Sequence, residues 1–174
     1  APNASEVDLS ELVQAEQYPY LRLWANHKDE EELTPMQIKH WHVLYDKVPE
    51  AAVNPNDHFV FENKELQQGQ QGFVSVAVAN VSDIPMDSLL VHYWIEDANR
   101  NKIKIPYPRQ DSLRAGQVLR DTVYFDTRNL SNQNKLWVEV NPRTETGLYD
   151  QPEQTHFNNL IEIPFGVSRD IQNP

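Results

Sequence analysis

Apolar and polar residues alternate most regularly over residues 69–80, a run that begins with a glycine-containing turn. One face of this run carries Val74, Val76 and Val78, and the other carries Phe73, Ser75, Ala77 and Ala79. A period of two residues with β-branched side chains is typical of a strand and not of a helix. The run therefore predicts a central strand, and we expect it to lie in the middle of a β-sandwich.

Short β patterns recur through the rest of the chain, with turn-forming residues between them. They cover residues 57–62, 72–81, 89–97, 102–107, 117–126, 135–140 and 160–167. About seven short strands in roughly 110 residues are typical of an immunoglobulin-like sandwich. We therefore expect an all-β chain, with an immunoglobulin-like antiparallel β-sandwich over residues 57–168 and a tail over residues 169–174.

The N-terminal part predicts two more strands, over residues 18–26 and 34–46, joined by an acidic loop at residues 28–32. An isolated hairpin is marginally stable in water, so this pair needs a further surface to pack on. We expect residues 1–48 to be the C-terminal part of a preceding β domain. Residues 49–56 carry two prolines and no long apolar pattern, so they are interpreted as a linker.

Charge and composition exclude several classes of partner and chemistry. The chain has 26 acidic and 15 basic residues, a formal net charge of −11, which repels phosphate backbones and anionic lipids. We expect no nucleic-acid partner, and no run approaches the roughly 20 apolar residues that membrane insertion requires. The absence of cysteine excludes thiol nucleophiles, disulfides and Cys-ligated zinc. With 5 glycines and neither a P-loop nor a dinucleotide fingerprint, phosphate-cradling loops are not expected.

Two histidines flank a tryptophan in the second predicted strand. His40 and His42 place two imidazoles on the same side of that strand, which is a geometry that a metal site uses. No third ligand follows nearby in the sequence. The interpretation we favour is that Trp41 faces a core while both imidazoles face solvent.

The loop that precedes the last predicted strand is rich in oxygen ligands. It carries Asn141, Glu145, Asp150 and Glu153, and calcium binds six to eight oxygens. The spacing does not match an EF-hand loop. Asp150 and Glu153 are the calcium candidates, but the sequence favours no metal, no cofactor and no catalytic residue.

Four aromatic residues on the predicted strands admit two interpretations. Tyr93 and Trp94 together with Tyr107 and Trp137 would form a platform for a sugar or a peptide. The interpretation we favour is that one member of each adjacent pair fills the core while the other is half covered at a sheet edge. On this basis we expect Trp137, like Trp41, to be a core residue.

Residues 157–159, Phe-Asn-Asn, lie where the long loop must return to the sheet. We expect Phe157 to fill the core at this point. The side-chain amides of Asn158 and Asn159 can form hydrogen bonds with backbone groups that are left unpaired at the start of a strand. The three residues are therefore predicted to be structural, with the asparagine pair closing the loop.

Several of these motifs resemble a known family. Residues 69–82 (GQQGFVSVAVANVS), Asn141-Pro142, Glu153 and Asn158-Asn159 resemble the bacterial cell-adhesion-related domain. The pattern of that family closes with an Asp-Pro, a Glu and an Asn-Asn pair before the last strand, and the likeness covers residues 57–167. The chain departs from it at Asn141, where the family has Asp, which weakens the calcium interpretation.

A second resemblance spans most of the chain. It is similar to the β-sandwich region that follows the peptidase domain in large Bacteroidetes proteins of the gingipain-type cysteine peptidase family, which includes sortase components of the type IX secretion system. The motifs are YPYLRL (18–23), WHVLYD (41–46), VPE (48–50), MDSLLV (86–91), PYPRQDSL (106–113) and QPEQTHFNN (151–159). The peptidase machinery itself is not in this chain, because there is no cysteine to act as its nucleophile.

The sequence and the two resemblances together imply a non-catalytic module of a secreted or cell-surface protein of a Gram-negative bacterium, in an extracellular or periplasmic location. We expect a spacer and docking domain beside a peptidase domain. Its partners would be neighbouring domains of the same polypeptide and other secretion or surface proteins. The alternatives are a carbohydrate-binding module that uses exposed aromatic residues and a calcium-stabilised adhesin domain.

Overall fold

The computed structural model describes residues 8–9, 20–26, 28–33, 42–61 and 66–169. The chain divides into two compact units, Ala1–Asp46 and Lys47–Pro174. Within the described residues, every strand belongs to the second unit, and there is no helix. No helix in this part of the chain is long and apolar enough to cross a membrane.

The first sheet is built around β4 (Gln71–Asn80), as the alternation of residues 69–80 predicts. Strands β1 (Ala51–Val53) and β2 (Phe59–Phe61) pair with successive parts of one side of β4, and β7 (Val118–Asp126) pairs along the other side. All three pairings are antiparallel. β4 is therefore a central strand, which explains why seven of its ten residues, Val74 to Asn80, are buried in an unbroken run.

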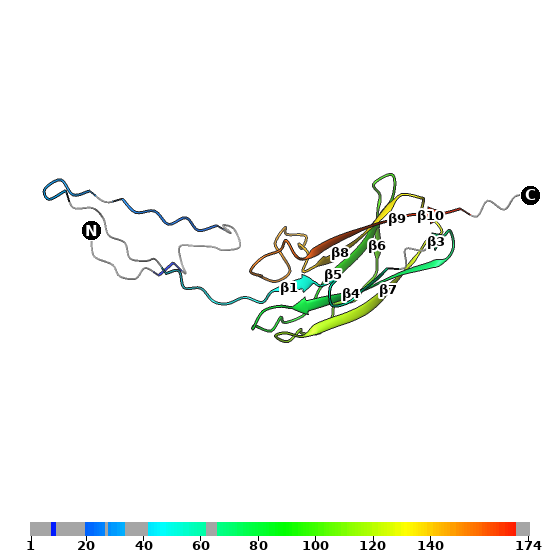
Figure 1. Ribbon diagram of the computed structural model, residues 1–174, viewed down its shortest axis with the longest axis horizontal. Coiled ribbons are helices and arrows are strands. Elements are labelled where there is room, and N and C mark those ends of the chain that lie inside the picture. Colours follow the sequence, from blue (N-terminus) through cyan, green and yellow to red (C-terminus); the bar gives the residue numbers. More distant parts are fainter. Residues whose placement is uncertain (1–7, 10–19, 27, 34–41, 62–65, 170–174) are drawn as a thin grey trace, which may run out of the picture. The chain divides into compact units, whose positions relative to one another are not determined.

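The second sheet faces the first and has the strand order β6-β5-β8-β9, with every pairing antiparallel. A short parallel pair, β3 with β10, lies at one end of the sandwich (Figure 1). The bounds are Leu66–Gln67 for β3, Val91–Glu96 for β5, Lys102–Ile105 for β6, Asn134–Val140 for β8, Leu160–Phe165 for β9 and Val167–Ser168 for β10. The predicted all-β sandwich is confirmed.

The core lies between the two sheets and is formed by alternate residues of the central strands. Val74 of β4 and Leu136 of β8 are completely buried, and Phe125 and Phe165 pack with their ring centroids 5.5 Å apart. Gly72 is required beside them, because a Cβ atom at this position would lie 2.3 Å from the ring of Phe125. Gly72, the second residue of β4, thus makes room for an aromatic side chain of β7.

The segment that was interpreted as a linker, residues 49–56, contains a strand. β1 pairs antiparallel with the last residues of β4, with Ala51 opposite Asn80, and Ala51 is completely buried. Pro49 and Pro55 lie outside the strand, so neither removes a ladder hydrogen bond from it. Three small apolar residues between the prolines therefore complete the edge of the first sheet.

The predicted N-terminal hairpin is not seen in the described part of the first unit. Residues 20–26 and 42–46 fall within its two expected strands and form no strand. Their apolar side chains lack a core: Tyr20 is 92% exposed and Trp24 is 79% exposed. This agrees with the marginal stability of an isolated hairpin. Trp41 and His40 lie outside the described residues, so their predicted roles stay predictions.

Candidate functional site

The long loop between β8 and β9, residues 141–159, is fastened to the point where the chain enters the sandwich. Glu50, just before β1, is 7% exposed. Its Oε1 accepts hydrogen bonds from Thr155 Oγ1 (2.5 Å) and Asn158 Nδ2 (2.8 Å), and its Oε2 accepts one from the backbone N–H of Thr155 (2.9 Å). One carboxylate therefore holds residues that are more than a hundred positions away in the sequence.

A second carboxylate completes this contact. The side chain of Glu153 is fully buried, with Oε1 accepting from the backbone N–H of Ala51 (3.3 Å) and Oε2 accepting from Asn159 Nδ2 (2.5 Å). His156 Nδ1 lies 3.4 Å from Glu153 Oε2. We call Glu50, Glu153, Thr155, Asn158 and Asn159 the clasp. It joins β1 to the loop without the help of a lysine or arginine.

Burial controls the charge of the clasp. Desolvation raises the pKa of Glu153 to about 7, and the nearby carboxylate of Glu50 adds to the rise, while hydrogen bonds from Asn159 and Asn141 oppose it. Burial also lowers the pKa of His156. Neutral amide donors stabilise a buried carboxylate less than a cation does, so Glu153 takes up a proton near neutral pH.

The structure places the predicted loop-closing residues in two different environments. Asn159 is 3% exposed and Asn158 is half-buried, and both amides close the loop. Their side-chain partners are the clasp carboxylates, while their own carbonyls accept from the N–H groups of Val140 and Val53. Phe157, in contrast, is 86% exposed, so the prediction that it fills the core is wrong. The turn from His156 to Asn159 directs the two asparagines inward, which leaves Phe157 outside.

The two calcium candidates both have protein partners. Asp150 forms a bidentate ion pair with Arg109, with both N–O distances 2.6 Å, and this partner holds the pKa of Asp150 below its usual range. The oxygens of Glu153 accept N–H groups in the clasp. Asn141 uses its amide to bind both backbone groups of Gln151. Nowhere in the described ranges do three or more His, Asp or Glu side chains form a group that suits a metal ion.

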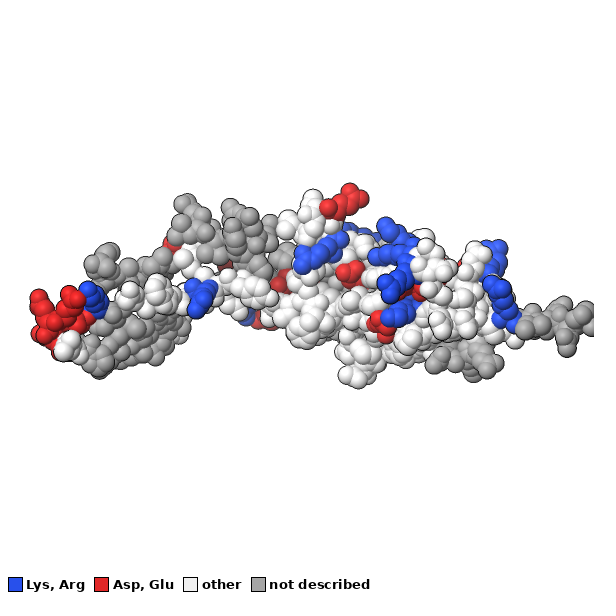
Figure 2. All heavy atoms as spheres, turned by 90° about the horizontal axis from the view of Figure 1, so that it is seen from above, with Lys and Arg blue, Asp and Glu red and all other residues white. Residues whose placement is uncertain are grey.

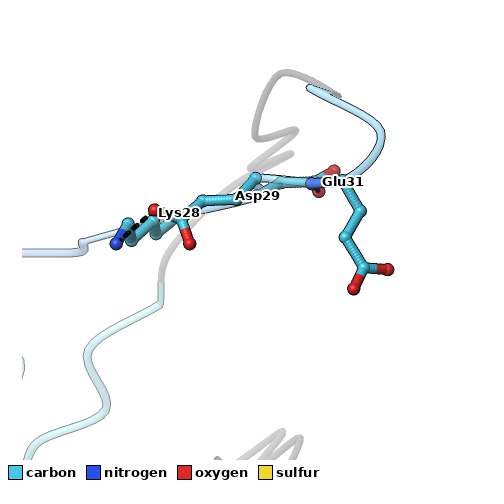
Figure 3. A pocket seen from close by; sticks show the side chains of 4 residues that line it. Lys28, Asp29 and Glu31 are labelled. Atoms are coloured by element: carbon cyan, nitrogen blue, oxygen red, sulfur yellow. Dashed lines mark hydrogen bonds and ion pairs between the residues drawn. The ribbon is translucent and has the colours of Figure 1, made fainter.

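The acidic loop of the first unit, residues 28–32, is an open turn (Figure 3). Asp29 Oδ1 accepts the backbone N–H groups of Glu31 and Glu32, and Lys28 pairs with Glu30 at 2.5 Å. The side chain of Glu31 extends away from the loop in Figure 3. These carboxylates do not converge on one point, as is usual for a solvated run of like charges.

The aromatic residues divide between the two faces of the second sheet. Tyr93 and Tyr107 point inward, with ring centroids 5.0 Å apart, whereas Trp94 and Trp137 lie on the outer face. The prediction that Trp137 is a core residue is therefore wrong. Leu136 and Val138, its neighbours on β8, are completely buried, and alternation turns Trp137 outward between them.

The two outer tryptophans form an ordered row with two lysines. Their indole rings are parallel to within 6°, with centroids 5.8 Å apart. Lys102 Nζ lies 3.7 Å from the centroid of Trp94, and Lys135 Nζ lies 5.8 Å from that of Trp137 and 2.9 Å from Glu162. We call Lys102, Trp94, Trp137 and Lys135 the aromatic row. The ammonium groups favour the faces of the indoles because the ring quadrupole attracts cations.

A serine–histidine contact lies on the outer face of the first sheet and was missed by the sequence analysis. His58 Nε2 is 2.8 Å from Ser75 Oγ, which donates to the carbonyl of Asp121. Ser75 is only 6% exposed, so a substrate carbonyl has no approach to its hydroxyl. The contact satisfies the hydrogen-bonding groups of the buried Ser75 hydroxyl. The spacing of the two residues in the sequence does not indicate it.

Comparison with known proteins identifies the architecture. No family model matches the chain, and no curated protein matches it. The crystal structure of the CARDB domain of a Pyrococcus furiosus protein, in complex with di-metal ions, superposes with a TM-score of 0.51 and 15% identity, covering 81% of this chain and all of that chain. The chain has the fold of a cell-adhesion-related, or CARDB, domain.

Two further solved structures are similar to this chain. The solution NMR structure of the same Pyrococcus furiosus domain has a TM-score of 0.50 at 15% identity and covers 70% of this chain and 97% of that chain. A β-glucosidase from Listeria innocua has a TM-score of 0.49 at 14% identity, and the match covers 76% of this chain and 19% of the enzyme. At such identities the CARDB likeness concerns the fold. The resemblance to the gingipain-type family stays a prediction.

Proposed function

We propose that this chain is a non-catalytic β-sandwich module of a secreted or surface-attached bacterial protein, in which it acts as a spacer and docking domain beside a peptidase domain. The observation that carries the proposal is the direction of the chain through the second unit. β1, where the chain enters, and β10, where it leaves, lie at opposite ends of the sandwich (Figure 1). A module with this geometry holds its two neighbours apart.

The strand pairings define this separation. β1 pairs with Val78–Asn80 at the end of β4, whereas β10 pairs with β3, which is followed by the turn that begins β4. The ten residues of β4 therefore separate the two points. At about 3.3 Å per residue the module adds roughly 30 Å between its neighbours.

Two further observations support the proposal. The CARDB-like fold is the architecture that the resemblance to cell-adhesion-related domains implies, and it suits a module of a secreted or surface protein. The longer motifs, such as those at residues 106–113 and 151–159, support a position after a peptidase domain. The neighbouring domains of the same polypeptide, and other secretion or surface proteins, are the proposed partners.

The test uses the full-length protein that contains this chain. In one variant residues 47–169 are deleted, and in a second they are replaced by an unrelated β-sandwich whose ends lie equally far apart. The amount of protein at the surface and its peptidase activity are measured. We expect deletion to lower one or both, and replacement to restore what depends on spacing. Normal amount and activity after deletion, or a full-length protein without a peptidase domain, would contradict the proposal.

A further inference from the structure

The outer face of the second sheet combines aromatic rings with polar groups of both signs. β-sheet register places Lys104, Trp94, Trp137 and Glu162 opposite one another across the four strands. On one side of these four residues Glu96 lies between Lys102 and Lys135, and on the other side His92 lies opposite Glu139. Figure 2 views the molecule from above Figure 1 and shows Lys and Arg side chains gathered over part of this side.

The indoles on this face are packed but not enclosed. Trp94 and Trp137 are both half-buried: their rings stack on each other, Lys102 lies over Trp94, and Nε1 of Trp137 is buried without a hydrogen-bond partner among the described residues. Lys102 and Lys135 are both exposed to solvent. A lysine on a ring face at a surface site is held only by a weak cation–π interaction, so a ligand oxygen can compete for it.

The polar groups around the indoles alternate between hydrogen-bond donors and acceptors. Lys104 is exposed and has no ion-pair partner in the described part of the chain, and Glu139 and Glu96 are half-buried beside the row. Ammonium groups only donate and carboxylates only accept. A ligand that bears many hydroxyl groups satisfies both kinds, because each hydroxyl both donates and accepts.

We propose that the outer face of β6-β5-β8-β9 binds an extended, neutral polysaccharide. Trp94 and Trp137 contact the C–H faces of successive sugar rings, and Lys102 turns from the ring of Trp94 to a sugar oxygen. Lys104 donates to hydroxyl groups, and Glu139 and Glu162 accept from them. This activity is additional to the spacer role and does not depend on it.

Charge favours a neutral ligand over an anionic one. The three lysines of the face are interspersed with three glutamates, and the chain carries a net charge of −11. A polyanion is repelled by these carboxylates and by the long-range field. Tyr124, an aromatic residue on the opposite sheet, is 57% exposed and packs against Phe73, with ring centroids 6.1 Å apart, so it serves as a control on the other face.

The experiment is native affinity electrophoresis of residues 1–174 in gels that contain one soluble polysaccharide each. The neutral probes are β-glucan, xylan, mannan and dextran, and polygalacturonate is the anionic probe. The variants are Trp94→Ala, Trp137→Ala, Lys104→Ala and, as the control, Tyr124→Ala. Far-ultraviolet circular dichroism and thermal melting show whether each variant is folded, and Lys104→Ala tests the face without removing an indole.

We expect at least one neutral polysaccharide to retard the wild type. Trp94→Ala or Trp137→Ala should weaken this retardation about tenfold, as the loss of an aromatic anchor does, and Lys104→Ala should weaken it measurably while Tyr124→Ala should not. Three results would overturn the proposal. They are no retardation by any neutral probe, equal retardation of wild type and both tryptophan variants, or retardation by polygalacturonate alone that disappears at high salt.

Discussion

Glu153→Gln tests the electrostatics of the clasp. We expect it to raise the free energy of unfolding above neutral pH, whereas most substitutions of buried groups lower it. The ordinary pKa of a glutamate is 4.5, and burial raises that of Glu153 to about 7 in the folded chain. A raised folded-state pKa means that the protonated form is favoured in the native state. The stability that this provides is complete below about pH 4.5 and is lost as the pH rises through about 7.

The magnitude follows from the size of the shift. At 1.36 kcal/mol per pKa unit, the rise from 4.5 to about 7 means that keeping Glu153 ionised at pH 8 costs about 3 kcal/mol of folding free energy. Glutamine removes this cost but has only one acceptor oxygen for the two donors, Ala51 N–H and Asn159 Nδ2, so about 1 kcal/mol is lost. We expect the variant to be about 2 kcal/mol more stable than wild type at pH 8.

The assay is urea unfolding followed by tryptophan fluorescence at several values between pH 4.5 and 8. The difference in free energy of unfolding between variant and wild type should grow with pH and favour the variant only at the upper end. Glu145→Gln, at an exposed position of the same loop, is the control and should show no such trend. A difference that does not change with pH would refute the assignment of a buried, protonatable carboxylate.

Three further changes test the surrounding structure. Asn159→Ala should lower the free energy of unfolding by about 1–3 kcal/mol because it leaves Glu153 short of a donor, whereas Phe157→Ala should have no effect in the same urea titration. Leu136→Ala should cost about 2–5 kcal/mol, and Trp137→Ala should cost less than this, since Trp137 lies on the outer face. Added calcium, or its removal by chelation, should leave the melting temperature unchanged, because the oxygens of Asp150 and Glu153 already have protein partners; a rise with calcium would contradict this.

The alternation of apolar and polar residues was sufficient to predict where the longer strands lie, but not which face of the sheet every side chain occupies. β4, β5 and β8 alternate over six or more residues, so their positions follow from the period of two. In β8 the charged residues Lys135 and Glu139 share a face with Trp137, and this signal places Trp137 outside. The prediction that Trp137 fills the core did not use this signal. β1 has three residues, too few for a period to show.

The clasp was predictable only in part, for a reason that concerns distance along the chain. Asn158 and Asn159 precede a strand and follow a long loop, which indicates that they close it. Glu50 carries no comparable local signal, because its partners Thr155 and Asn158 are 105 and 108 residues away. Neither periodicity nor spacing reports such a contact, and only the return of the loop to the edge of the first sheet creates it.

The clasp also helps to hold the start of the second unit against the sandwich. Between Lys47 and Val53 the chain is bound to the sandwich at successive points. Lys47 pairs with Asp83 at 2.5 Å, the carbonyl of Glu50 accepts from Val81 N–H at 2.8 Å, and Val53 N–H donates to the carbonyl of Asn158 at 3.0 Å. The exposed Lys47 pair contributes little by itself, whereas the buried contacts at Glu50 and β1 are costly to break. The path of the chain along the sandwich is therefore fixed from Glu50 onward. Because Glu153 is part of this fastening and burial raises its pKa to about 7, we expect the fastening to lose stability as the pH rises above neutrality.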